Sequence, residues 1–104
     1  MYSRADVIHI AEIFIQLVSI EFPLRDAYLF GSYAKGQAAE LSDIDLAIVS
    51  DKFEGSRFFD KQKINKILLS CSSDLEIHPF RTDDFTIENP FVKEIIENGI
   101  KLDL

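Results

Sequence analysis

Apolar and polar positions follow two different periods along the chain, and the changes of period mark the expected elements. Residues 7–20 are almost all apolar, apart from polar positions spaced three and four residues apart, which predicts one helix that ends before Phe22-Pro23. Ser3 or Asp6 can cap this helix. Its narrow polar stripe consists of His9, Glu12, Gln16 and Ser19.

The apolar arc of this first helix is wider than a small domain normally needs. A lone surface helix usually shows a broader polar face, so the arc is expected to be unusually buried or covered by another protein. Ile8 and Ile15, seven residues apart, would then face a partner. The core stripe is expected to consist of Val7, Ala11, Phe14 and Val18.

The rest of the chain predicts strands and helices in alternation. Strands are expected over 25–30, 44–49 and 74–80, the second central because it is strongly apolar and β-branched. Residues 31–42 are small and polar and predict a turn with one helical turn. A turn is expected at 51–55, followed by a helix that begins at Ser56 or Asp60 and ends near Ser70. After a short turn at 82–85, a helix is expected over 91–97, where Asn98-Gly99 ends it. Residues 100–104 are expected to add an edge strand. Core positions of the 56–70 helix are expected at Phe59, Ile64, Ile67 and Leu68.

This order predicts an α/β (α+β) fold in one domain, residues 1–104, with a small mixed sheet flanked by helices. A chain of 104 residues can bury one core but leaves little for a second substrate lobe, so a partner chain is expected to supply any second wall. The single cysteine, Cys71, excludes an internal disulfide and fits a reducing cytosol. No signal-peptide or membrane-spanning pattern is present, which favours a cytoplasmic location.

The charge balance restricts the partners. The formal net charge is −7, from 18 acidic and 11 basic residues. Such a surface repels a phosphate backbone, which argues against nucleic acid as the main partner. A nucleotide stays possible because metal ions and backbone N–H groups can meet its charge locally.

The segment from Gly31 to Asp45 carries the candidate chemistry. Asp43 and Asp45 lie two residues apart on a strand, so their carboxylates project from one face, about 6.6 Å apart at the backbone. Hard oxygen ligands placed in this way suit magnesium, which binds one or two carboxylates together with substrate phosphates. Gly31 lets the backbone approach a phosphate closely, and Ser32 adds an N–H and a hydroxyl donor. Acidic pairs are usually solvated and Gly-Ser is a common turn, so the joint pattern carries more weight than either part.

Gly31-Ser32, ten intervening residues and Asp43-Ile44-Asp45 resemble the signature of the polymerase-beta-like nucleotidyltransferases. Ala34-Lys35-Gly36 and the ending over 94–100 are similar to its minimal branch. The resemblance implies a mixed sheet flanked by helices, two magnesium ions (or manganese), and nucleotide transfer from a triphosphate such as ATP. Minimal members are often antitoxins paired with HEPN-type ribonuclease toxins, and some transfer AMP to a tyrosine of the toxin.

The family pattern also implies a third carboxylate on an adjacent strand. Asp74, Glu76 and His78 share one strand face, and Glu76 is preferred because apolar residues flank it as in the family. It would bind metal or take the proton of the attacking hydroxyl, although the family more often has aspartate there. Asp74 is the alternative, and a solvated strand face is the third possibility. His78 is expected to be a polar edge residue, and Lys35 to contact the triphosphate or to lie in solvent.

The sequence therefore predicts a nucleotidyltransferase that acts on a hydroxyl of a partner protein, as the antitoxin of a HEPN-type toxin. Gly31, Ser32 and Lys35 would bind the nucleotide, and Asp43, Asp45 and Glu76 the metal ions. Two alternatives stay open. One is a binding module that neutralises its partner by occlusion, and the other is an enzyme that modifies a small molecule, which the short chain disfavours. A homo-oligomer could also cover the first helix.

Overall fold

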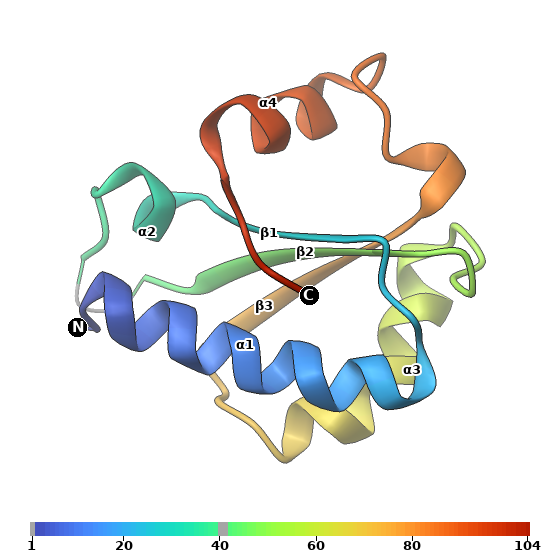
Figure 1. The fold of residues 1–104 in the computed structure, drawn as a ribbon, viewed down its shortest axis with the longest axis horizontal. Helices are drawn as coiled ribbons and strands as arrows, with labels where there is room; N and C mark the ends of the chain where they lie inside the picture. The colour runs from blue at the N-terminus through green and yellow to red at the C-terminus, as the bar shows by residue number, and fades with distance from the viewer. Residues whose placement is uncertain (1, 40–41) are drawn as a thin grey trace.

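The structure, a computed structural model, describes residues 2–39 and 42–104, so that residues 40 and 41 of the expected 31–42 turn lie outside it. Its strands form one four-stranded sheet flanked by helices on both faces (Figure 1). The α+β class with a small mixed sheet is confirmed. In chain order the elements are α1 (Arg4–Glu21), β1 (Asp26–Phe30), α2 (Ser32–Lys35), β2 (Ile44–Ser50), α3 (Arg57–Leu69), β3 (Leu75–Arg81), a 3-10 turn (Thr82–Asp84), α4 (Pro90–Asn98) and β4 (Ile100–Lys101).

The sheet has the order β3-β2-β1-β4, which places the apolar strand β2 between two neighbours, as its composition predicts. β1 runs antiparallel to β2 and to β4, whereas β2 and β3 are parallel. A parallel pair needs a crossover connection, and α3 supplies it. β3 and β4 are the two edge strands.

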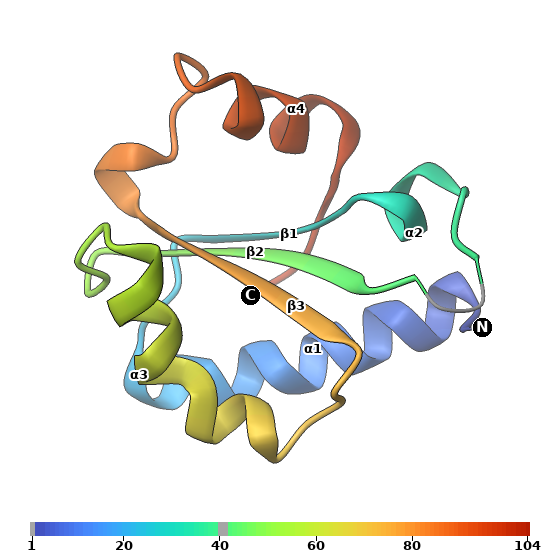
Figure 2. The same cartoon turned by 180° about the vertical axis from the view of Figure 1, so that it is seen from behind.

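The two faces of the sheet have different covers. Figures 1 and 2 show α1 and α3 together on one face and α4 on the other. Strand alternation sends Ile44, Leu46 and Ile48 into the core under α1 and α3, so Asp45 and Ala47 point to the α4 face. α4 packs over β1, which leaves the α4 face more open beside β3. Polar side chains on β2 and β3 can therefore face solvent there.

Helix α1 begins as its first residues predict. Ser3 accepts from the backbone N–H of Asp6, and the Asp6 carboxylate accepts from the N–H of Ser3, which completes a capping box. The expected core stripe is fully buried and the expected polar stripe is exposed. No helix among the described residues has the length and apolar character that crossing a bilayer needs.

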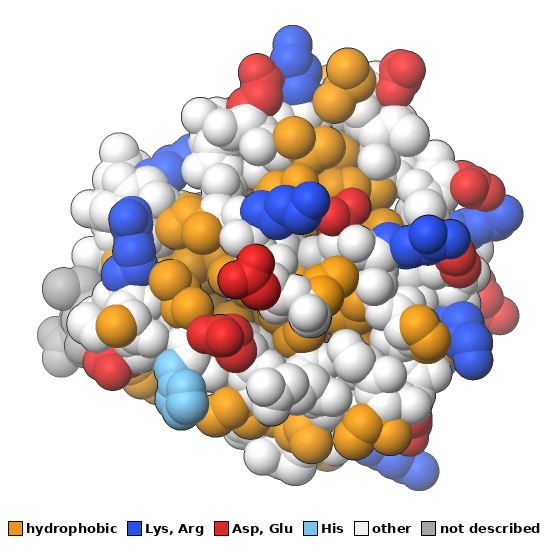
Figure 3. Space-filling model, viewed as in Figure 1, with side chains coloured by type: hydrophobic (Ala, Val, Ile, Leu, Met, Phe, Trp, Pro, Cys, Tyr) orange, Lys and Arg blue, Asp and Glu red, His pale blue; other side chains and the backbone are white. Residues whose placement is uncertain are grey.

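The expectation that Ile15 faces a partner is wrong. Its exposed fraction is 3%, because both Phe14 and Ile15 pack toward the core, and Ile8 is half-buried against it. The apolar side chains of α1 that remain exposed to solvent are Ile13, Leu17 and Ile20. Figure 3 shows apolar side chains in the lower part of the molecule, in the region of α1.

Two isoleucines of α1 therefore allow a matched test of this burial. Ile15→Val should lower the free energy of unfolding by about 0.5–1.5 kcal/mol, since it removes a buried methylene. Ile20→Val makes the same change at a side chain that is 80% exposed, so it should leave stability nearly unchanged. Urea denaturation of both variants measures the difference. Equal effects would show that Ile15 is not a core residue.

Helix α3 contains a second correction. Phe59 was expected in the core but is 54% exposed, whereas Asp60, one position later, is 1% exposed. The Asp60 carboxylate accepts from the backbone N–H groups of Glu54 and Gly55, at 2.7 and 3.0 Å. These bonds compensate its burial, so a charged residue takes the core-facing position that hydrophobicity assigned to Phe59. Ile64, Ile67 and Leu68 do pack on the core.

Candidate active site

The backbone of Gly31 and the carboxylate of Asp45 lie in direct contact where β1 ends. Gly31 has φ +74° and ψ −150°, a region that is open almost only to glycine. A Cβ built there would overlap Oδ2 of Asp45 and lie 3.2 Å from its Cγ. The antiparallel register that pairs Phe30 with Asp45 brings the two segments together. Glycine is therefore required here both by its φ angle and by the Asp45 side chain.

Asp43 and Asp45 flank Ile44, whose side chain is buried under α1 and α3. Alternation along β2 places the carboxylate of Asp45 on the α4 side of the sheet. Asp43 lies just before the strand, so the shared face of the two carboxylates stays a prediction. Asp43 is exposed and Asp45 is partly buried. In the parallel register Glu76 of β3 lies directly beside Asp45.

Glu76 is ionised and paired with a lysine. Lys61 Nζ of α3 lies 2.8 Å from Glu76 Oε1, and the guanidinium of Arg57 lies 3.6 Å from the same oxygen. The hydrogen bond from Lys61 is the main cause that holds the pKa of the Glu76 carboxyl below its usual range. The carboxylate is therefore charged, but its contacts are basic side chains.

The alternative third carboxylate, Asp74, is engaged elsewhere. The hydroxyl of Tyr2 donates to Asp74 Oδ2 at 2.5 Å, and this bond raises the pKa of the Tyr2 phenol. Asp74 thus ties the segment before α1 to the start of β3. Of the two carboxylates, Glu76 is the one that pairs in register with Asp45.

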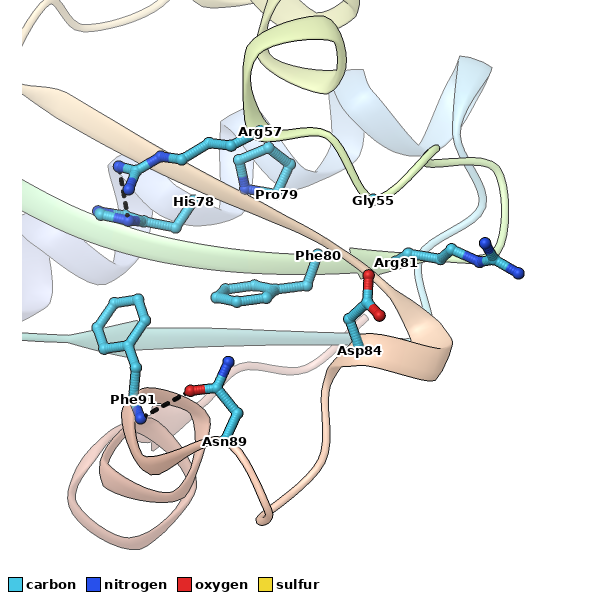
Figure 4. A pocket seen from close by; sticks show the side chains of 9 residues that line it. All are labelled: Gly55, Arg57, His78, Pro79, Phe80, Arg81, Asp84, Asn89 and Phe91. Carbon is cyan, nitrogen blue, oxygen red and sulfur yellow. Dashed lines mark hydrogen bonds between the residues drawn. The ribbon is translucent and has the colours of Figure 1, made fainter.

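Two hollows open on either side of Phe91, the second residue of α4. The smaller, of about 160 Å³, contains Gly31 and Lys35, whose ammonium lies 3.2 Å from Glu94 Oε1. The hydrogen bond from Lys35 is the main cause that lowers the pKa of Glu94. The larger, of about 370 Å³, is shown in Figure 4. It is lined by Gly55, Arg57, His78, Pro79, Phe80, Arg81, Asp84, Asn89 and Phe91.

The family model of the nucleotidyltransferase domain matches residues 8–102. The chain belongs to this family. The resemblance seen in the Gly31-Ser32 and Asp43-Ile44-Asp45 pattern is confirmed at the level of the family. No curated protein matches the sequence.

Solved structures share the nucleotidyltransferase fold of this chain. A candidate nucleotidyltransferase from Sulfolobus solfataricus is 18% identical, with a TM-score of 0.65 over 94% of this chain and 80% of its own. A toxin–antitoxin complex with AMP-PNP is 24% identical, with a TM-score of 0.59. A mutant of the MntA-HpeT toxin–antitoxin complex is 22% identical, with a TM-score of 0.57. Both of these matches cover 88% of this chain and 71% of the other.

The donor atoms of a nucleotidyltransferase metal site are of the right kind here. Carboxylate oxygens are the ligands that magnesium prefers, and Gly31 leaves room for one of them at the end of β1. Within residues 2–39 and 42–104, no three His, Cys, Asp or Glu side chains are grouped so that they could hold a metal ion. The three-carboxylate site therefore stays a prediction. To bind a metal ion, Glu76 would have to break its ion pair with Lys61.

Sequence reasoning missed the contacts that three side chains make with Glu76 and Asp45. Lys61 and Arg57 reach Glu76 from α3 because β3 is an edge strand, and nothing in their local sequence indicates this. His78 was expected to be a polar edge residue, and β3 is indeed an edge strand. Its side chain is nevertheless only 12% exposed, and its Nε2 lies 3.3 Å from Asp45 Oδ1. The shared strand face of Glu76 and His78 was the available signal.

Proposed function

We propose that this chain is a metal-dependent nucleotidyltransferase that transfers a nucleotide, AMP from ATP, to a hydroxyl of a partner protein. Gly31, Ser32 and Lys35 would bind the triphosphate. The observation that supports the proposal is the contact between the Gly31 backbone and the Asp45 carboxylate. It brings together a turn of the kind that can bind phosphate and an oxygen of the kind that can bind a metal ion. The metal ligands would be Asp43, Asp45 and Glu76.

The reaction needs a small set of contributions from the chain. The acceptor oxygen forms a bond to the α-phosphorus, the bond from that phosphorus to the bridging oxygen breaks, and pyrophosphate leaves with the electron pair. Two magnesium ions, once bound, would stabilise the charge on the attacking and leaving oxygens. Asp45 would act on the α-phosphate only through the metal ion that it would help to hold. Glu76, released from Lys61, could take the proton of the hydroxyl.

The proposed partner is a toxin of the HEPN type, with this chain as its antitoxin. Two solved structures of this fold are toxin–antitoxin complexes, and one of them contains AMP-PNP. The other carries two Asp-to-Glu substitutions two residues apart, which is the spacing of Asp43 and Asp45. The exposed apolar side chains Ile13, Leu17 and Ile20 on α1 offer a surface that such a partner could cover.

Thermal unfolding with and without ligand tests the nucleotide and metal site. Magnesium with ATP should stabilise the wild type, by about 2.7 kcal/mol at one hundred times the dissociation constant. Asp43→Asn/Asp45→Asn should lose this stabilisation. Without ligand the double variant should unfold at the wild-type temperature or above, because two neighbouring like charges are removed. An unchanged ligand shift in the double variant would remove both residues from the proposed site.

One observation favours the second candidate function, a binding module that acts by occlusion. The ion pair from Lys61 to Glu76 commits the third carboxylate to a side chain of the protein itself. If that pair persists with magnesium and ATP present, the site is not catalytic. Mass measurement of the partner after incubation with labelled triphosphates separates the two functions, since only an enzyme leaves a nucleotide on it.

A further inference from the structure

The side chain of His78, on β3, packs against Phe30 of β1 and Phe91 of α4. The family pattern gives this histidine no role. The ring of Phe30 lies 4.9 Å away at 67°, and the ring of Phe91 lies 5.9 Å away at 66°, both edge-on. Such contacts fix the plane of the imidazole. Its two nitrogens then point in defined directions. Nε2 faces Asp45, and Nδ1 faces Arg57, a contact that Figure 4 shows.

The contact with Arg57 determines which nitrogen of His78 carries the proton. Arg57 Nη2 lies 3.0 Å from His78 Nδ1, and a guanidinium can only donate. Nδ1 must therefore accept. In the neutral ring the proton is then on Nε2, which donates to Asp45 Oδ1 at 3.3 Å.

The two oxygens of Asp45 therefore have different neighbours. Oδ1 accepts from His78, and Oδ2 lies against the Gly31 backbone, where even a Cβ would not fit. A short side chain with one oxygen hydrogen-bonded and the other packed against the backbone is restricted in its rotamer, so its remaining lone pairs keep one direction. Substitution of a residue that holds a metal ligand in place typically lowers metal affinity or activity by 10–100-fold.

We propose that His78 is a positioning residue: its Nε2–H orients the Asp45 carboxylate for metal binding, and Arg57 sets the tautomer that allows this. The inference rests on the proposed function, because it takes Asp45 as a metal ligand. His78 itself binds neither metal nor nucleotide. Arg57 acts one step further away, through Nδ1.

The first test measures the tautomer in the wild-type protein without any substitution. Nitrogen-15 NMR of the ring at pH 8 should show a protonated Nε2 and an unprotonated Nδ1 for His78. The opposite tautomer would overturn the inference, because an unprotonated Nε2 cannot donate to a carboxylate.

The second test measures Mn2+ binding in the presence of AMP-PNP, by the electron paramagnetic resonance of free Mn2+. His78→Phe keeps an aromatic ring between Phe30 and Phe91 but has no donor, and it should weaken Mn2+ binding by about 10–100-fold. His78→Gln places an amide N–H near the position of Nε2 and should restore most of the affinity. The chain has one other histidine, His9, which is exposed on α1, so His9→Phe is the matched control and should bind as the wild type.

The outcomes separate this inference from the function on which it rests. Wild-type affinity in His78→Phe would overturn the positioning role alone, as would equal losses in His78→Phe and His78→Gln, which would show that the ring only packs. If His78→Phe does not fold, the comparison of His78→Gln with the wild type decides: a loss beyond 10-fold contradicts the proposed hydrogen bond. A wild-type protein that binds no Mn2+ with AMP-PNP would overturn the proposed function itself.

Discussion

Asp45→Asn should abolish nucleotide transfer to the partner while the two proteins still associate. The substitution keeps the size of the side chain but removes the negative charge that a metal ion needs. Loss of one ligand of a metal site removes several kcal/mol of transition-state stabilisation, and about 4 kcal/mol corresponds to about a thousandfold in rate. The labelled nucleotide that remains on the partner measures transfer, and co-purification measures association. Asp103→Asn, the same change at an exposed position near the chain end, is the control and should transfer normally.

The dose of this protein distinguishes catalysis from occlusion in the same experiment. An enzyme neutralises its partner at substoichiometric amounts, whereas a binding module needs one copy for each partner. Asp45→Asn should therefore fail to protect at low dose and protect only near equimolar amounts, if at all. Full protection by Asp45→Asn at every ratio would sink the enzymatic proposal and leave the binding module.

The second large effect is expected at Gly31, where alanine should reduce nucleotide transfer by at least about 100-fold. Its Cβ would occupy the position of the Asp45 carboxylate, so the side chain of Asp45 would have to rotate away from Gly31 and from His78. The resulting loss of a positioned ligand lowers activity, and the strained φ and ψ of residue 31 lower stability by about 1–3 kcal/mol. Transfer assays and urea denaturation measure the two effects separately.

Gly36 provides a matched control for this substitution. It also has a positive φ, +72°, but a Cβ there would meet no atom of the described residues within 4 Å. Gly36→Ala should therefore lower stability by about 1–2 kcal/mol and leave transfer close to wild type when measured on the folded protein. Equal loss of transfer in the two variants would mean that backbone strain near α2, and not contact with Asp45, explains the effect.

Local sequence predicted the elements well because their signals are local. The capping box at Ser3 and Asp6 and the β-branched run of β2 each act within a few residues. The prediction failed where a group outside the element decides the environment. Asp60 is buried because backbone N–H groups of the preceding loop bind it, and that displaces Phe59 to the surface.

In the candidate site, too, the local pattern was predictable and the surroundings made by other elements were not. The sequence pattern singled out Gly31 and Asp45, and the structure brings these two residues into contact. The surroundings of Glu76 depend on how α3 packs beside an edge strand, and no spacing in the sequence encodes that. For His78, alternation along β3 indicated the correct face, but only the register with β2 shows that Asp45 is within reach.

The sheet order also has a consequence for how the site assembles. Gly31 meets Asp45 through β1 and β2, which are neighbours in sequence and close a short loop. Glu76 and His78 meet Asp45 through the parallel pair of β2 and β3, after the chain has passed through α3, and contacts of greater sequence separation form more slowly. Detachment of the edge strand β3 would therefore take Glu76 and His78 away together, while Gly31 stays against Asp45. The part of the site that we propose to bind the nucleotide is thus expected to form first and to outlast the detachment of β3.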